Sequence, residues 1–115
     1  MLNATALGDL GVPGASIYSA SKAALASLGR SLAAELAERG IRVNVVNPGP
    51  IATPIFDRTG LPRDATQQMA ESIRRQVPLK RFGQPEDVAH AVLDLAGASF
   101  VTGNELFVDG GLSRV

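Results

Sequence analysis

The chain has 115 residues and carries 11 lysines and arginines against 11 aspartates and glutamates, so its formal net charge is zero. A neutral balance without a basic run argues against nucleic acid and anionic membranes as partners, and no stretch approaches the length of a membrane span. The absence of cysteine excludes disulfides, thiolate metal sites and a cysteine nucleophile, and it fits a cytoplasmic location.

The first half of the chain predicts a strand, a helix and a second strand. Residues 1–5 predict the end of a short strand, and Gly8, Gly11, Pro13 and Gly14 predict the loop that follows. Alanines and leucines recur at helical spacing over residues 17–39, and Gly40 follows as a stop signal. Residues 41–46 form a β-branched run of strand length, so a long helix leads into a buried type of strand, as in parallel α/β units.

The second half adds two helices and a last strand. Residues 47–54 hold three prolines and are predicted to be irregular, and residues 57–60 are predicted to form a loop. A polar helix is predicted over 65–76, and Pro85 opens another that ends near Gly97. Residues 105–108 form a last strand. This order predicts a single α/β domain over 1–115, with about three parallel strands, covering helices and one side of the sheet missing.

Two residues near the start of the long helix have a spacing that suits acid/base chemistry. Tyr18 and Lys22 lie four residues apart, so both project from one helix face. A free phenol keeps its proton at neutral pH, and a nearby ammonium favours the phenolate. Such a pair can pass a proton to or from a carbonyl or alcohol oxygen. The bare spacing also occurs by chance in many helices, so it does not establish a site alone.

The surroundings of this pair are similar to the short-chain dehydrogenase/reductase family. The matching blocks, in order and at the spacing of the family, cover nearly the whole chain: YSASKAAL over 18–25, RVNVVNPGPI over 42–51 with Thr53 and Pro54, RFGQPEDVA over 81–89, and VTGNE with VDGG over 101–111. The resemblance implies the C-terminal part of a Rossmann-type, doubly wound parallel sheet. It also implies hydride transfer between NAD or NADP and a small carbonyl or alcohol substrate.

The resemblance also implies a role for individual residues. Tyr18 corresponds to the catalytic acid/base, and Lys22 to the residue that favours its ionised form and holds the nicotinamide ribose. Asn47, Pro48 and Gly49 match the turn against the nicotinamide. In the same segment, Ile51 matches a backbone donor to the carboxamide, and Thr53 a hydroxyl that reaches the amide or the phosphates. No metal ligand is expected, since His90 has no second ligand at suitable spacing.

One departure from the family concerns the residue that polarises the substrate oxygen. The family usually places a serine thirteen residues before the tyrosine, and Thr5 stands at that position. A threonine hydroxyl can make the same hydrogen bond, but its methyl group restricts χ1 and can displace the oxygen. Thr5 is therefore predicted to be a third catalytic residue, with impaired performance.

A second departure is the lack of a dinucleotide-binding motif. No G-x-x-x-G-x-G or G-x-G-x-x-G pattern occurs, although such a glycine-rich turn binds the pyrophosphate in the family. The 115 residues alone are therefore predicted not to catalyse the reaction. Two alternatives remain open: a non-catalytic, truncated module that acts by oligomerising or by pairing with a longer relative, and a fragment of a full-length enzyme.

The pattern of apolar residues predicts self-association. The residues that could pack on another helix are Ala20, Ala24, Ala34, Leu28, Leu32 and Leu36, and the corresponding helix forms a dimer interface in the family. Residues 2–5 are expected to form an edge without a neighbouring strand. We therefore expect a homo-oligomer through the helix over 17–39 and the C-terminal strand. The substrate pocket is predicted to be lined by residues 56–76.

Overall fold

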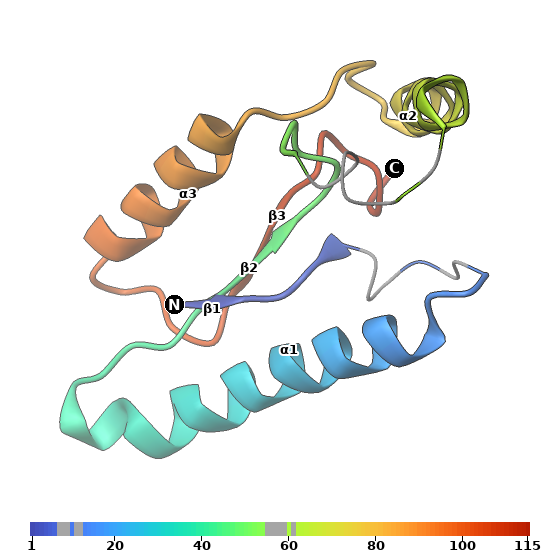
Figure 1. Cartoon of the computed structure of the whole chain (residues 1–115). Coiled ribbons are helices and arrows are strands. Elements are labelled where there is room, and N and C mark those ends of the chain that lie inside the picture. Colours follow the sequence, from blue (N-terminus) through green and yellow to red (C-terminus); the bar gives the residue numbers. More distant parts are fainter. Residues whose placement is uncertain (7–9, 11–12, 55–59, 61) are drawn as a thin grey trace.

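A computed structural model describes residues 1–6, 10, 13–54, 60 and 62–115. The three strands form one parallel sheet in the order β1-β2-β3, and Figure 1 shows α1 and α3 on opposite sides of it. The predicted parallel α/β arrangement is confirmed. The elements in chain order are β1 (Leu2–Asn3), α1 (Ser16–Leu36), η2 (Ala37–Arg39), β2 (Val45–Pro48), α2 (Arg63–Gln76), α3 (Pro85–Gly97) and β3 (Glu105–Val108).

The predicted bounds of the central strand were wrong. Strand β2 begins four residues later than the β-branched run and includes Asn47 and Pro48, which were predicted to be irregular. Before it, Val43 is held by side-chain bonds, since its N–H donates to the Thr102 hydroxyl over 3.1 Å. Pro48 fits in a central strand because its nitrogen faces β1 beyond the last residue pair of that ladder. On the β3 side, the Gly49 N–H donates to the Val108 carbonyl over 3.0 Å.

Helix α1 approaches the sheet through its smallest residues. Its buried residues are Ala26, Gly29 and Ala33. A Cβ atom on Gly29 would stand 2.4 Å from Cγ2 of Val45, so only glycine allows this spacing without a shift. Leu28, by contrast, is 48% exposed, and its face points away from the sheet. The leucines are therefore divided: Leu25 packs on the core of Ala4, Ala26 and Val45, whereas Leu28 faces away from it.

The helix ends show local signals that the sequence predicts well. Gly40 has a φ of +68°, and its N–H donates to the Ala37 carbonyl, so it ends the first helical segment as predicted. Pro85 opens α3, where the Asp87 carboxylate accepts bonds from Arg81 Nη1 over 2.9 Å and from the Gln84 N–H over 2.8 Å. These bonds, that of Arg81 foremost, hold the pKa of Asp87 below its usual value. No serine caps α1, whose first turn is preceded by Ala15.

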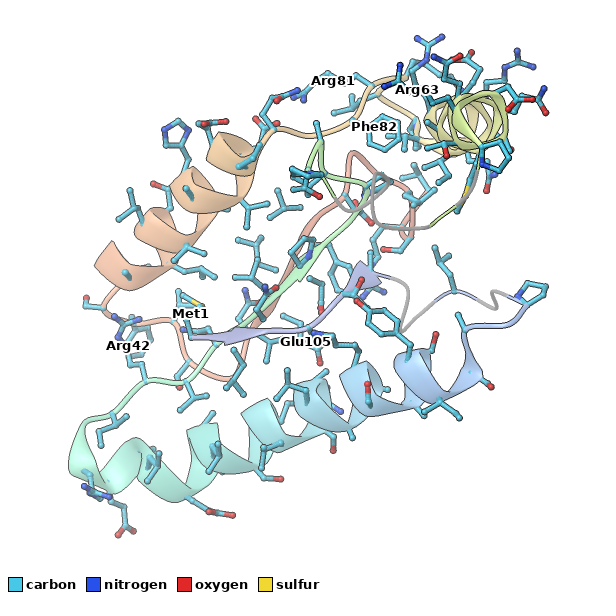
Figure 2. All side chains as sticks on the ribbon, in the orientation of Figure 1. Met1, Arg42, Arg63, Arg81, Phe82 and Glu105 are labelled. Carbon is cyan, nitrogen blue, oxygen red and sulfur yellow. The ribbon has the colours of Figure 1, made fainter. Side chains whose placement is uncertain are left out.

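The C-terminal end of α3 is tied to the start of β2 by one arginine. The Arg42 guanidinium donates to the carbonyls of Leu95 over 3.0 Å, Ala96 over 2.7 Å and Val101 over 3.1 Å. Figure 2 shows Arg42 beside this end of the helix. A positive charge here satisfies carbonyls that the helix leaves unpaired and complements the helix dipole.

Replacing Arg42 with methionine is expected to lower the free energy of unfolding by about 2 kcal/mol, because three carbonyls lose a charged donor. Urea unfolding followed by circular dichroism at one fixed protein concentration measures this change. Arg39→Met, on the exposed η2 segment, is the matched control and should change the free energy by less than about 0.5 kcal/mol. Equal effects of the two substitutions would contradict the role of Arg42.

Candidate active site

The carboxyl ends of β1 and β2 lie side by side and bring two predicted site residues together. The ladder pairs Asn3 with Val46, so the segments that follow the two strands leave the sheet at the same edge. Thr5 lies two residues after β1, and its hydroxyl donates to the Pro48 carbonyl over 3.4 Å. Ligands of open α/β sheets bind at this edge, where neighbouring parallel strands end.

The Tyr18–Lys22 pair is held against the same edge from α1. The Lys22 ammonium lies 5.8 Å from the centre of the Tyr18 ring and donates to the Asn3 carbonyl over 3.2 Å. An ammonium has three N–H donors, so this bond leaves two for other oxygens. Tyr18 is 48% exposed, so a ligand can reach its side chain. The structure therefore places the predicted acid/base pair beside the last residue of β1, two residues before Thr5.

The turn after β2 packs tightly against the residue that follows β3, and it leaves one backbone N–H outside the bridge to Gly83. A Cβ atom on Gly49 would stand 2.6 Å from Cα of Asp109, so the turn passes against the backbone that follows β3. Ile51 forms a parallel bridge with Gly83, in which the Pro50 carbonyl and the Ala52 N–H make the two bonds. The N–H of Ile51 itself therefore points away from Gly83. This orientation suits the predicted backbone donor to a carboxamide.

The remaining predictions concern Thr53, the segment expected to line the substrate pocket and the two expected loops. Thr53 is exposed and lies in a bend after the Ile51 bridge. Of the segment predicted to line the substrate pocket, residues 56–59 and 61 lie outside the described residues, as do Gly8, Gly11 and residues 57–59 of the two predicted loops. Helix α2 buries none of its residues. Figure 1 shows α2 away from α1, near the carboxyl ends of the strands.

Three residues of the neighbourhood were not predicted from the sequence. Asn3 supplies the carbonyl that holds Lys22. Glu105 accepts a hydrogen bond from the buried Asn47 side chain over 3.2 Å. Asp109 packs directly against Gly49 of the turn that follows β2. The VTGNE and VDGG patterns included Glu105 and Asp109, but they gave no sign of these contacts, since carbonyl contacts and pairs across strands have no local signature.

Asp109 is a buried carboxylate with a full set of partners. Only 7% of the residue is exposed, and its oxygens accept bonds from the Ser113 hydroxyl over 2.6 Å, the Ser113 N–H over 2.9 Å and the Gly111 N–H over 2.9 Å. Burial by itself raises the pKa of the carboxyl, but these hydrogen bonds outweigh it and hold the pKa of Asp109 below its usual value.

Asp109 is expected to make stability depend on pH below about pH 4. Its folded pKa lies below the ordinary value of 3.8, so the carboxylate stabilises the fold fully above that value. The contribution is lost as the pH falls through the folded pKa. We expect the Tm of the chain to fall more steeply on acidification than that of Asp109→Asn. Glu71 and Asp87, whose pKa values are also lowered, are present in both proteins. Parallel curves of Tm against pH would contradict this expectation.

The described part of the chain lacks a metal-binding cluster and a membrane-spanning helix. No group of three or more histidine, aspartate or glutamate side chains within residues 1–6, 10, 13–54, 60 and 62–115 is arranged to hold a metal ion. In the same part of the chain, no helix has both the length and the hydrophobicity needed to cross a bilayer.

Comparisons with known proteins agree on one family. The family model described as enoyl-(acyl carrier protein) reductase matches residues 1–113. Carbonyl reductase family member 4 of Xenopus laevis is 46% identical over 106 residues, which are 92% of this chain and 41% of that protein. An inactive 2-(S)-hydroxypropyl-CoM dehydrogenase 2 of Xanthobacter autotrophicus is 42% identical over 110 residues, which are 94% of this chain and 48% of that protein.

The fold has a close counterpart among solved structures. A small-chain dehydrogenase in complex with NADPH matches with a TM-score of 0.88 and 30% sequence identity, over 99% of this chain and 50% of that one. The chain thus spans less than half the length of the two curated relatives named above. Its sheet and helices correspond to part of a larger dinucleotide-binding fold.

Proposed function

This chain belongs to the short-chain dehydrogenase/reductase family, and we propose that it supplies the acid/base part of an NAD(P)-dependent oxidoreductase that interconverts a carbonyl group and an alcohol. One observation carries the proposal. The Lys22 ammonium lies 5.8 Å from the Tyr18 ring centre while it is bound to the end of β1, at the edge where Thr5 and the turn after β2 meet.

The proposed mechanism assigns the proton to Tyr18. In reduction, its hydroxyl donates a proton to the substrate oxygen, and the positive charge of Lys22 stabilises the phenolate that is left. The Thr5 hydroxyl turns its one O–H from the Pro48 carbonyl, to which it is bonded over 3.4 Å, and donates it to the same oxygen, which polarises the carbonyl. The nicotinamide supplies the hydride when it is bound. In oxidation of an alcohol, the same groups act in reverse, with Tyr18 as the base.

Six residues are proposed to hold the nicotinamide end of the cofactor. Two N–H donors of Lys22 remain for the ribose hydroxyls after its bond to Asn3. Asn47, Pro48 and Gly49 are proposed to form the wall beside the ring, and the N–H of Ile51, which points away from Gly83, to donate to the carboxamide. Thr53 follows as a hydroxyl donor. The orientation of Ile51, fixed by its bridge to Gly83, supports this assignment.

The pyrophosphate and adenosine have no comparable site in the sequence, because the 115 residues contain no glycine-rich dinucleotide motif. Remote contacts of this kind supply much of the binding that positions a reacting group. We therefore propose that catalysis needs a second segment of the kind that the longer relatives contain. Alone, the chain then resembles the non-catalytic alternative, and one of its relatives is itself described as inactive.

Titration with NADH and NADPH tests this division of labour. The purified 115-residue chain is expected to show no saturable change in nucleotide fluorescence up to about millimolar concentration, because only the nicotinamide end has a site. The same chain, joined to the N-terminal part of the Xenopus laevis relative, is the positive comparison and should bind at micromolar levels. Saturable micromolar binding by the chain alone would contradict the need for a second segment.

We also propose that the chain self-associates, which its exposed apolar side chains support. A cytoplasmic location is proposed as well, in keeping with the lack of cysteine. On α1, Ile17 is 87% exposed and Leu28 is 48% exposed, and β3 is an edge strand of the sheet. Large exposed apolar residues on one face commonly mark an interaction surface. Sedimentation of the chain is expected to show a dimer or a higher oligomer, and a folded, monodisperse monomer at micromolar concentration would contradict this proposal.

A further inference from the structure

One carboxylate connects α1, β3 and β2 on the same side of the sheet. Glu105, the first residue of β3, pairs through Oε1 with the Arg30 guanidinium of α1. Its other oxygen, Oε2, accepts a hydrogen bond from Nδ2 of Asn47 over 3.2 Å. Figure 2 shows Glu105 in the space between the sheet and α1. Each oxygen of Glu105 therefore binds a different element.

The burial of the three residues gives this link its direction. Asn47 is 2% exposed, whereas the Glu105 side chain is 22% exposed and the Arg30 side chain 56% exposed. A buried amide needs a partner, because an unpaired donor costs about 1–3 kcal/mol. Glu105 provides that partner from the next strand, and Arg30 offsets the charge of Glu105 from the solvent side. The link is thus a path from the surface of α1 to a buried residue of β2.

The two ends of the link lie next to the candidate site. Asn47 directly precedes Pro48 and Gly49, which form the turn proposed to face the nicotinamide. Arg30 follows Lys22 by eight residues, about two turns of the same helix. Val45, two residues before Asn47, packs beneath Gly29, so Asn47 also faces α1. The link therefore spans the interface across which Lys22 and the turn must keep their spacing.

We propose that Glu105 and Arg30 are positioning residues, which fix the Asn47 side chain and hold α1 in one register on β2. This inference rests on the proposed function, since the positions they maintain are those of the acid/base pair and the nicotinamide turn. Neither residue touches the reacting atoms. They act through Asn47 and through the helix that carries Tyr18 and Lys22.

The two residues can be separated by conservative substitutions. Glu105→Gln keeps an oxygen for Asn47 but loses the charge that pairs with Arg30, whereas Glu105→Ala loses both. Arg30→Lys keeps the charge, and Arg30→Met loses it at similar length. Arg39→Met removes an arginine from the exposed η2 segment, away from the link, and is the matched control.

The first test needs no activity. In the ¹⁵N-labelled 115-residue chain, the side-chain amide resonance of Asn47 is assigned by its loss in Asn47→Asp. We expect Glu105→Ala to shift it and to speed its hydrogen exchange. Glu105→Gln should leave its exchange slow, and Arg39→Met should leave it unchanged. An Asn47 resonance that does not move in Glu105→Ala would overturn the link itself.

The second test measures the consequence for the reaction, in the chain joined to the nucleotide-binding part of a relative. We expect Glu105→Ala and Arg30→Met to lower kcat by about 10- to 100-fold, with Arg30→Lys restoring most of it, because small displacements of reacting groups are costly. The KM for NADPH should change by less than about threefold, since the adenosine contacts lie elsewhere. A shifted resonance with unchanged kcat would show a purely structural link and overturn the positioning role.

Failure of the proposed function gives a different result from failure of this inference. If Tyr18→Phe keeps full activity in the joined protein, the acid/base assignment fails, whatever the Asn47 resonance shows. If Tyr18→Phe is inactive while the variants of Glu105 and Arg30 keep full kcat, only the positioning role fails.

Discussion

Tyr18→Phe is expected to lower kcat for carbonyl reduction by about 10²–10⁴-fold, in a protein that joins this chain to the nucleotide-binding part of the Xenopus laevis relative. The substitution removes one hydroxyl and keeps the ring that lies 5.8 Å from the Lys22 ammonium. The proton donor is lost while the packing of α1 is preserved. Oxidation of NADPH, followed by its absorbance with a carbonyl compound that the relative reduces, measures kcat and KM separately.

Two controls separate chemistry from folding in this experiment. Because Tyr18 is half-exposed, the Tm of the joined protein should change little when Tyr18 is replaced with phenylalanine. Ser27→Ala removes a hydroxyl from an exposed position on the same helix and should leave kcat unchanged. A Tyr18→Phe protein that retains more than about one tenth of kcat would show that another group moves the proton.

Gly49→Ala is expected to have the largest effect on stability, a loss of about 3 kcal/mol. A Cβ atom there would stand 2.5 Å from Cβ and 2.6 Å from Cα of Asp109, and a backbone atom cannot move aside as a flexible side chain can. Relief of this clash would push the turn away from β3, where the Gly49 N–H is bonded to the Val108 carbonyl. Urea unfolding at fixed protein concentration measures the loss.

Gly97→Ala is the matched control for this substitution. Nothing lies within 4 Å of the position that its Cβ atom would take, and Gly97 is the last residue of α3. Alanine loses less conformational freedom than glycine in a helix, so stability should stay equal or rise by up to about 1 kcal/mol. Similar losses in both variants would mean that the contact with Asp109 does not restrict Gly49.

The sequence predicted those elements whose ends are marked by local signals. Pro85 and its acidic first turn located α3, and the predicted strand over residues 105–108 matches β3 (Glu105–Val108). The central strand was misplaced because its bounds depend on pairing. The β-branched run includes residues 41–44, of which Val43 and Asn44 make further bonds to residues 101–104, so that the paired strand begins only at Val45. Local pattern carries no information about that partner.

The candidate site was predicted in part, through motif order. Tyr18 and Lys22 share a helix face at a fixed spacing, and Thr5 meets Pro48 because two parallel strands end together. The support beneath the site could not be predicted, because Asn47 and Glu105 are 58 residues apart and nothing in their two motifs indicates that the side chains meet. Likewise, the point where α1 comes nearest to the sheet is marked by Gly29, since close approach selects the smallest side chain, while Leu25 packs on the same core.

The three carbonyl contacts of Arg42 have a consequence for the rate at which the fold opens. They join residues 53 to 59 positions apart, so they require most of the chain between β2 and β3 to be in place before they form. Contacts of such long sequence separation are costly to close early in folding. Interactions that form after the transition state slow unfolding and leave the folding rate almost unchanged. We therefore expect the contacts of Arg42 to form late in folding, to slow unfolding and so to lengthen the lifetime of the native state.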